Sequence, residues 1–130
     1  MKYTKTMDYA LHVIVLILEH ENQENLSLQK MAESLDVSPT YLSKILTQLT
    51  KAGLIRSTPG KNGGYCLRKN KEEISFLDVI EAVDGNAHVF VPSVCRSESC
   101  KVQDTIEQAQ EQMLSFLAGK KVYEVLSESG

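Results

Sequence analysis

Two short amphipathic segments joined by a three-residue turn constrain the fold of this 130-residue chain more than any other feature. The first segment, 28–35, follows Ser27, whose hydroxyl can cap the first amides of a helix. The second begins at Ser38 and Pro39, because serine caps well and a proline at the first helical position loses no hydrogen bond. Its apolar residues then recur at helical spacing: Leu42, Ile45, Leu46, Leu49 and Ala52. Two helices linked this closely form a helix-turn-helix.

In such a unit the second helix places the side chains of its first turns in the major groove of DNA. Here its outward positions carry hydroxyls, an amide and an ammonium group, and no carboxylate. Such groups hydrogen-bond base edges and phosphates. We therefore predict that DNA is contacted by Ser27, Ser38, Pro39, Thr40, Tyr41, Ser43, Lys44 and Gln48.

A glycine-rich loop between two strand-like runs follows the second helix. The runs are 54–57 and 65–68, and the loop 58–64 holds Pro-Gly, Asn-Gly and Gly-Gly pairs, which favour a hairpin with positive φ angles. A β-hairpin after a recognition helix is a wing, whose basic tip approaches phosphates or the minor groove. A nucleotide-phosphate loop is disfavoured, because no Gly-Lys-Ser/Thr ends it and no helix follows. The wing residues expected to contact DNA are Arg56, Lys61, Asn62, Gly63, Gly64 and Arg68.

The distribution of charge supports a polyanionic partner, although the net charge is −3. The window 38–71 contains no acidic residue and seven basic ones, which leaves 7 of the 14 basic residues against all 17 acidic ones elsewhere. A solvated surface would mix the two signs, so the window is a candidate footprint for nucleic acid. The alternative is a chance cluster on a solvated face. The seven cations are Lys44, Lys51, Arg56, Lys61, Arg68, Lys69 and Lys71.

Three further helices are predicted around this unit. Residues 4–20 form an unusually apolar one, which we expect to pack against two neighbours or a partner chain. Ser75 opens a short helix that ends near Gly85. Residues 101–118 form a long helix with glutamine and glutamate on one face, and a last turn at 121–126 is expected to dock on it. The fold class is thus mainly α with a small β-hairpin wing, a winged helix-turn-helix domain followed by a long C-terminal dimerisation helix.

The long helix carries an apolar stripe that the small winged domain does not need for its core. We read the stripe as a dimerisation surface, and folding back onto the same domain is the alternative. We expect a DNA-binding domain at 1–85, a cysteine-bearing sensor loop at 86–100, and the dimerisation helix with a C-terminal turn at 101–130. The dimerisation residues are Val102, Ile106, Ala109, Met113, Phe116 and Leu117.

Composition and motifs indicate a regulator rather than an enzyme. The sequence contains no serine–histidine–acid set, no zinc-type Cys/His spacing and no phosphate loop. It has no run of 18 apolar residues and no signal-peptide pattern at its start, so we expect no membrane partner and a cytoplasmic location. An adaptor that uses the winged helix for protein contacts alone would not need a window free of acids.

Several segments resemble the Rrf family of bacterial winged helix-turn-helix transcriptional regulators, whose members include IscR, NsrR and CymR. The resemblance covers nearly the whole chain and implies a homodimer with crossing C-terminal helices, which binds a pseudo-palindromic operator on double-stranded DNA and usually represses. Ser43 stands where iron–sulfur biogenesis regulators of the family have a glutamate that tunes operator choice, so their sequence preference does not transfer. The segments are Thr4–Leu11, Ser38–Leu42, Leu49–Ile55, Gly60–Leu67 and Ile74–Ile80.

The signal is the less determined half of the prediction. Iron–sulfur members of the family use three cysteines in the loop after the helix near Gly85, plus a fourth ligand. Here that loop holds only Cys95 and Cys100, and two cysteines do not normally hold a cluster. A dimer could complete the ligand set of an iron–sulfur cluster that senses nitric oxide or iron–sulfur status with Asp8 and His12, four residues apart on one helix face, or with His88. Asp8 otherwise serves as a helix N-terminal charge, and His12 as a packed core histidine.

Thiol chemistry is the interpretation we favour. Arg96 follows Cys95 and Lys101 follows Cys100, and neighbouring cations favour the reactive thiolate. Four residues between the two cysteines leave room for a disulfide in an irregular loop. Cysteines that are silent, with control by a protein partner or a metabolite, are the third possibility. The remaining cysteine, Cys66, is expected to be a small strand residue.

Overall fold

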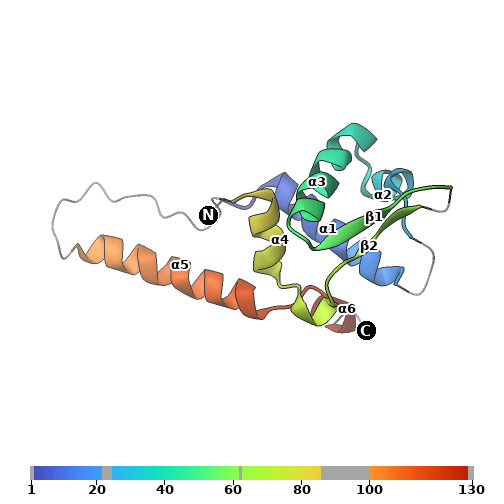
Figure 1. Ribbon diagram of the computed structural model, residues 1–130. Helices are drawn as coiled ribbons and strands as arrows, with labels where there is room; N and C mark the ends of the chain where they lie inside the picture. The colour runs from blue at the N-terminus through green and yellow to red at the C-terminus, as the bar shows by residue number, and fades with distance from the viewer. Residues whose placement is uncertain (1, 22–24, 62, 86–99, 129–130) are drawn as a thin grey trace.

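The computed structural model describes residues 2–21, 25–61, 63–85 and 100–128 (Figure 1). It confirms a mainly helical chain with one antiparallel hairpin. The elements in chain order are α1 (Lys5–Glu19), α2 (Leu28–Leu35), α3 (Pro39–Lys51), β1 (Ile55–Thr58), β2 (Gly64–Leu67), the 3₁₀ turn η1 (Lys71–Glu73), α4 (Phe76–Val83), α5 (Lys101–Gly119) and α6 (Glu124–Glu128).

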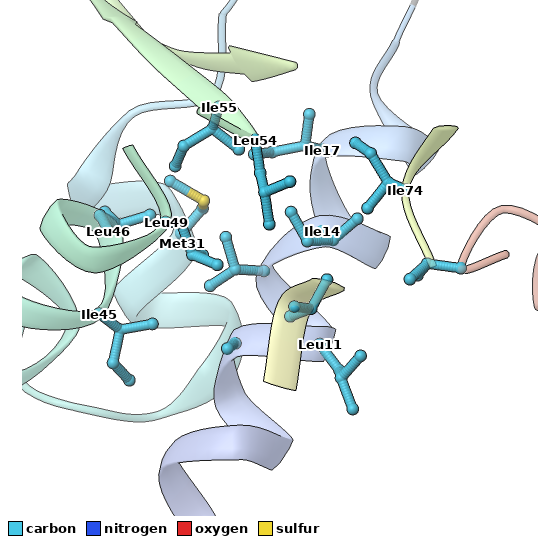
Figure 2. Close-up of a cluster of buried hydrophobic side chains, with 14 of the residues drawn as sticks. Leu11, Ile14, Ile17, Met31, Ile45, Leu46, Leu49, Leu54, Ile55 and Ile74 are labelled. Atoms are coloured by element: carbon cyan, nitrogen blue, oxygen red, sulfur yellow. The ribbon is translucent and has the colours of Figure 1, made fainter. Parts of the chain in front are cut away.

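Helix α1 is the centre of the core. Its hydroxyl cap Thr4 accepts a hydrogen bond from the Met7 amide, and the helix then contacts α2, α3, α4 and β2. Ile14 and Ile17 project from it into the apolar cluster that Figure 2 shows, opposite Met31 of α2. This burial explains why α1 is too apolar for a surface helix, and it confirms the expectation of several packing neighbours.

Helices α2 and α3 form the predicted helix-turn-helix, and both are capped as the sequence indicates. The Ser27 hydroxyl accepts from the Lys30 amide at 3.2 Å, and the Ser38 hydroxyl accepts from the Tyr41 amide at 3.1 Å. Between the helices, Asp36 adopts a left-handed conformation with φ of 54°, which reverses the chain within the short turn. The turn therefore sets the angle between the two helices through one unusual residue.

The wing is present, and its strands differ from the predicted ranges by one residue. Strand β1 pairs with β2 in the register Ile55 with Leu67 and Thr58 with Gly64. A third segment, absent from the sequence prediction, joins the edge of β2. Leu26 and Tyr65 exchange both backbone hydrogen bonds, at 2.8 and 3.3 Å. The base of the wing is thereby tied to the chain that links α1 to α2.

Two adjacent glycines let the backbone come this close. A Cβ atom at Gly64 would lie 2.6 Å from the carbonyl oxygen of Leu26, and one at Gly63 would overlap the carbonyl oxygen of Thr58. Both obstacles are backbone atoms, which cannot move aside as a side chain would. Any larger residue at either position must therefore displace the wing tip or the Leu26 segment.

Helix α4 and the C-terminal segment close the winged domain. The Ser75 hydroxyl and the Asp78 carboxylate form a capping box at the start of α4. The Phe76 amide donates to the Lys120 carbonyl at 2.9 Å, and the Val122 amide donates to the carbonyl of the residue before Ser75 at 3.0 Å. Val122 is 1% exposed within the core. The last turn was expected to dock on the long helix, and this was wrong, because its entry segment pairs with the residues before α4 instead.

Helix α5 contacts α4, and its N-terminal part projects beyond the winged domain (Figure 1). Its apolar residues are largely uncovered: Val102 is 71% exposed, Ile106 54% and Phe116 68%. Folding of these three residues back onto their own domain is therefore excluded. In the part of the chain that the structure describes, no helix combines the length and apolar character needed to cross a membrane.

Candidate nucleic-acid interface

The first turns of α3 present a polar surface to solvent, as predicted for a recognition helix. Thr40, Lys44 and Gln48 are exposed, and they recur at the spacing of one helix face. Pro39 and Ser43 are half-buried beside them. The surface thus offers a hydroxyl, an ammonium group and an amide along about two turns of helix, which suits contacts to base edges.

Ser38 caps the start of α3 and also presents its side chain to solvent. Its oxygen accepts the hydrogen bond from the Tyr41 amide, while its side chain remains exposed. A serine hydroxyl has one hydrogen to donate besides its lone pairs, so capping leaves that hydrogen available for an acceptor on DNA. The cap also orients the hydroxyl, because its oxygen is held against the first turn.

Tyr41 is less accessible than the sequence prediction supposed. The prediction placed it among the exposed positions of α3, whereas its side chain is half-buried. Its hydroxyl lies 3.0 Å from the Thr6 hydroxyl, and its ring meets the Tyr9 ring edge-on, with centroids 5.7 Å apart and planes at 79°. These contacts attach the first turn of α3 to the start of α1. Nothing in the sequence paired Thr6 and Tyr9 with Tyr41, because contacts between residues more than 30 positions apart leave no local pattern.

The predicted cations of the wing are exposed to solvent. Arg56, Lys61 and Arg68 are exposed, and Gly63 and Gly64 are half-buried in the loop and the strand. Asn62 was also predicted to contact DNA and lies outside the described residues. Ser27, the remaining predicted contact, lies at the start of α2 rather than on α3. It is half-buried, and its oxygen accepts the capping hydrogen bond from the Lys30 amide.

Most of the cations in the window 38–71 are exposed to solvent. Six of its seven cations have exposed side chains, and the described residues show an ion pair only for the seventh, Lys71, with Glu21. Phosphate contacts made by unpaired cations release condensed counterions from DNA, and this release drives association. The surface of α3 and the wing is therefore electrostatically prepared for a polyanion. The six are Lys44, Lys51, Arg56, Lys61, Arg68 and Lys69.

Comparison with known proteins places this geometry in a family. The Rrf2 family profile, described as an iron-dependent transcriptional regulator, matches residues 3–128. The chain belongs to the Rrf2 family. It is therefore a transcriptional regulator with a winged-helix DNA-binding fold, and not an enzyme.

Individual relatives agree with this assignment. YffB of Lactococcus lactis, named as an HTH-type transcriptional regulator, is 30% identical over 99% of this chain and 89% of its own length. The crystal structure of the oxidised form of Staphylococcus aureus CymR is 30% identical, covers 94% of this chain and 93% of its own, and has a TM-score of 0.79. The structure of CymR, the global cysteine regulator of Bacillus subtilis, has a TM-score of 0.87 over 98% of both chains, and its 21% identity supports the fold alone.

The candidate sensor residues of this Rrf2-family chain are only partly brought together. The Asp8 carboxylate accepts a hydrogen bond from the Tyr3 hydroxyl at 2.7 Å. Desolvation by burial, followed by this hydrogen bond and the charge of Asp8, raises the pKa of Tyr3 to about 12. His12 was expected to be a packed core histidine, and this was wrong. Its side chain is 57% exposed, and its Nδ1 lies 2.7 Å from the Asp8 carbonyl oxygen.

Asp8 and His12 lie together, with 3.5 Å between the His12 Nδ1 and an Asp8 carboxylate oxygen, but among the described residues no cysteine joins them as part of a metal-ligand group. Cys66 lies on β2, half-buried, as the small strand residue predicted. Cys100 is 8% exposed and precedes the first turn of α5, and Cys95 lies outside the described residues. Among the described residues, no three histidine, cysteine or acidic side chains gather as metal ligands. With Asp8 engaged by Tyr3, the described candidates do not fit an iron–sulfur cluster within one chain.

Proposed function

We propose that this protein is a homodimeric repressor that acts in the cytoplasm and binds a pseudo-palindromic operator through α3 and the wing. The observation that carries the proposal is the acid-free surface formed by the first turns of α3 and the hairpin, with its exposed and unpaired cations. We assign base contacts to Ser38, Thr40 and Gln48, and backbone contacts to Lys44 and to the wing, because hydroxyls and amides read base edges and cations neutralise phosphates.

We assign dimerisation to the uncovered face of α5. An exposed isoleucine, valine and phenylalanine on one helix are costly in water, and a second copy of the helix would cover all three. Two-fold pairing also explains a palindromic operator, since each subunit reads one half-site. The proposed interface comprises Val102, Ile106, Ala109, Met113, Phe116 and Leu117, of which Leu117 is half-buried and also packs against the core of its own chain. In this arrangement residues 1–85 bind DNA, 86–100 sense the signal and 101–130 dimerise.

We further propose that oxidation of Cys95 and Cys100 weakens DNA binding. Hydrogen peroxide transfers one oxygen to the Cys95 thiolate to give a sulfenic acid, its O–O bond breaks and the other oxygen leaves as hydroxide; the Cys100 thiol then attacks the sulfenic sulfur, forms the disulfide and releases water. Arg96 and Lys101 favour the thiolate forms. Because Cys100 directly precedes α5, the disulfide would pull on the first turn of the dimerisation helix and change the spacing between the two recognition helices of the dimer. A crystal structure is known for the oxidised form of the similar S. aureus CymR.

The test compares DNA binding by the protein in reduced and peroxide-treated states. Protein purified without oxygen is examined for a visible spectrum, iron and sulfide, and is then titrated with fragments of its own promoter region. We expect colourless protein whose affinity falls on oxidation, with the fall abolished in Cys95→Ser and retained in the matched control Cys66→Ser.

Four results contradict the proposal at different levels. Brown protein with bound iron and sulfide replaces the thiol mechanism with a cluster, for which Asp8 and His12 of one subunit would have to join cysteines of the other. Failure of both redox states to bind any genomic fragment at low salt rejects DNA-dependent regulation itself. A redox response that survives in Cys95→Ser leaves DNA binding intact and rejects Cys95 as the sensor. DNA affinity that is the same in the reduced and oxidised states assigns the signal to another partner, such as a protein or a metabolite.

A further inference from the structure

A polar cavity of about 510 Å³ lies beneath the wing, on the side of β2 that faces α1. We call it the under-wing cavity. Its floor includes Leu26 and Tyr65, which join the wing to the segment after α1, and its walls come from the end of α1, the two strands and the chain that leads through η1. Its volume is in the range of small-molecule sites, which run from roughly 300 to 1,000 Å³.

The charged groups around the under-wing cavity are mostly cations. Arg56, Arg68, Lys69 and Lys71 line it, against Glu21 and Glu72. The Lys71 ammonium nitrogen lies 3.6 Å from a carboxylate oxygen of Glu21, so these two groups largely balance each other.

The other three cations have no carboxylate partner in the described parts of the chain. Three unpaired cations line this concave surface together with one remaining carboxylate, that of Glu72, so the potential there is positive. A concave site concentrates such a field more than the convex wing tip does.

We propose that the under-wing cavity binds a small polyanion, a compact metabolite that carries at least two negative charges on phosphate or carboxylate groups. Guanidinium groups such as those of Arg56 and Arg68 bind both kinds of group in a bidentate manner, and Lys69 adds a third positive charge. An anion of this size would fill the cavity and contact β2 and the Leu26 segment at the same time.

This site would also regulate DNA binding, and that consequence rests on the proposed use of the wing. Arg56 and Arg68 belong both to the cavity and to the wing surface assigned to DNA, so a bound anion competes with phosphates for the same two guanidinium groups. A signal of this kind would need no cysteine. The cavity thus offers a route by which a metabolite controls the regulator.

The first experiment uses the full-length protein without DNA. Sodium pyrophosphate and sodium citrate are titrated separately at constant ionic strength, while the backbone amides of Leu26, Tyr65 and Lys69 are followed by NMR. We expect saturable shifts at these amides with at least one of the two anions, and the anion that binds identifies phosphate or carboxylate as the preferred group.

Lys69→Glu supplies the decisive variant, because Lys69 lines the cavity and, although it is one of the exposed cations of the window 38–71, it is not among the residues assigned a direct contact with DNA. Reversing its charge should raise the anion dissociation constant by at least about tenfold, since one charge-assisted contact becomes a repulsion. Lys51→Glu makes the same charge change at an exposed site outside the cavity and should leave the anion affinity nearly unchanged. Shifts that do not saturate with either anion, or that respond equally to the two variants, overturn the proposal.

Fluorescence anisotropy with promoter DNA then tests the regulatory step. The anion should weaken DNA binding by the wild-type protein at constant ionic strength, and much less so in Lys69→Glu. Equal weakening in both proteins rejects the regulatory role. If no DNA is bound under any condition, the proposed function fails while the NMR titration still decides on the cavity; if DNA binds and the amides do not respond, only the cavity proposal fails.

Discussion

Ser38 shows how one side chain can serve both folding and recognition. Its oxygen caps α3 by accepting from the Tyr41 amide, and its hydrogen is free to donate to DNA. The two roles respond differently to substitution. Alanine removes both the cap and the donor, whereas glycine removes the donor and keeps most of the capping preference.

We therefore predict that Ser38→Ala lowers the free energy of unfolding by about 1 kcal/mol, and that Ser38→Gly lowers it by only a few tenths. Both should lose a similar factor in operator affinity, because both lack the hydroxyl. Urea unfolding and fluorescence anisotropy measure the two effects. If Ser38→Gly binds the operator as tightly as the wild type does, the hydroxyl makes no contact with DNA.

Tyr3 provides a pH-dependent test of its bond to Asp8. Burial, and then the hydrogen bond and charge of Asp8, raise the pKa of Tyr3 from 10.0 to about 12 in the folded protein. The raised pKa means that the stabilisation is complete below pH 10 and is lost as the pH rises from 10 towards 12, because the unfolded phenol ionises first.

The Tyr3→Phe variant should accordingly lose less stability than the wild type over that pH range. Absorbance titration should show that the variant lacks one tyrosine with a high pKa. The control Asp8→Asn keeps the ring and removes the charge, and it should lower the pKa of Tyr3. A phenol titration that is the same in wild type and Asp8→Asn would show that the Tyr3–Asp8 contact does not form.

At the scale of elements, the sequence predicted the helix caps, because a cap depends on residues that are close together in the chain. Ser27, Ser38 and Ser75 each cap the helix that their position predicted, because capping depends on residues three apart. The contacts of Leu26 with Tyr65 and of Val122 with the start of α4 were missed, because each pairs short segments far apart in the chain. Such pairings have no period to detect.

The close approach of the Leu26 segment makes a specific demand on the wing. Gly64→Ala would put a methyl group 2.6 Å from the carbonyl oxygen of Leu26, so we predict a loss of about 1–3 kcal/mol in unfolding free energy. Its NMR spectrum should show a displaced Tyr65 amide. Gly85→Ala is the matched control, since nothing lies within 4 Å of its added methyl group. Equal stability of the two variants would contradict the observed path of the wing.

At the scale of the whole molecule, the oligomeric state depends on what covers the apolar face of α5. Side chains that are 54–71% exposed in one chain would be buried by a second copy. We predict that the wild type is a dimer and that Ile106→Glu is a folded monomer, because the buried carboxylate would have no partner. Sedimentation measures the mass, and circular dichroism checks the fold. Gln108→Glu, on the polar side of α5, should remain a dimer. A monomeric wild type, or a dimeric Ile106→Glu, would exclude α5 as the interface.

A dimer that places two wings on one operator should bind DNA with a steep dependence on salt. Each phosphate contact adds about −0.9 to the slope of log affinity against log salt. The most direct measurement is this slope for promoter DNA, determined for the wild type, for Lys61→Gln at the wing tip and for the control Lys101→Gln at the start of α5. We expect a steep wild-type slope, a reduction in its magnitude by about 1 per subunit in Lys61→Gln, and no change in Lys101→Gln. A flat wild-type slope, or equal effects of the two variants, would contradict DNA recognition by the helix and wing.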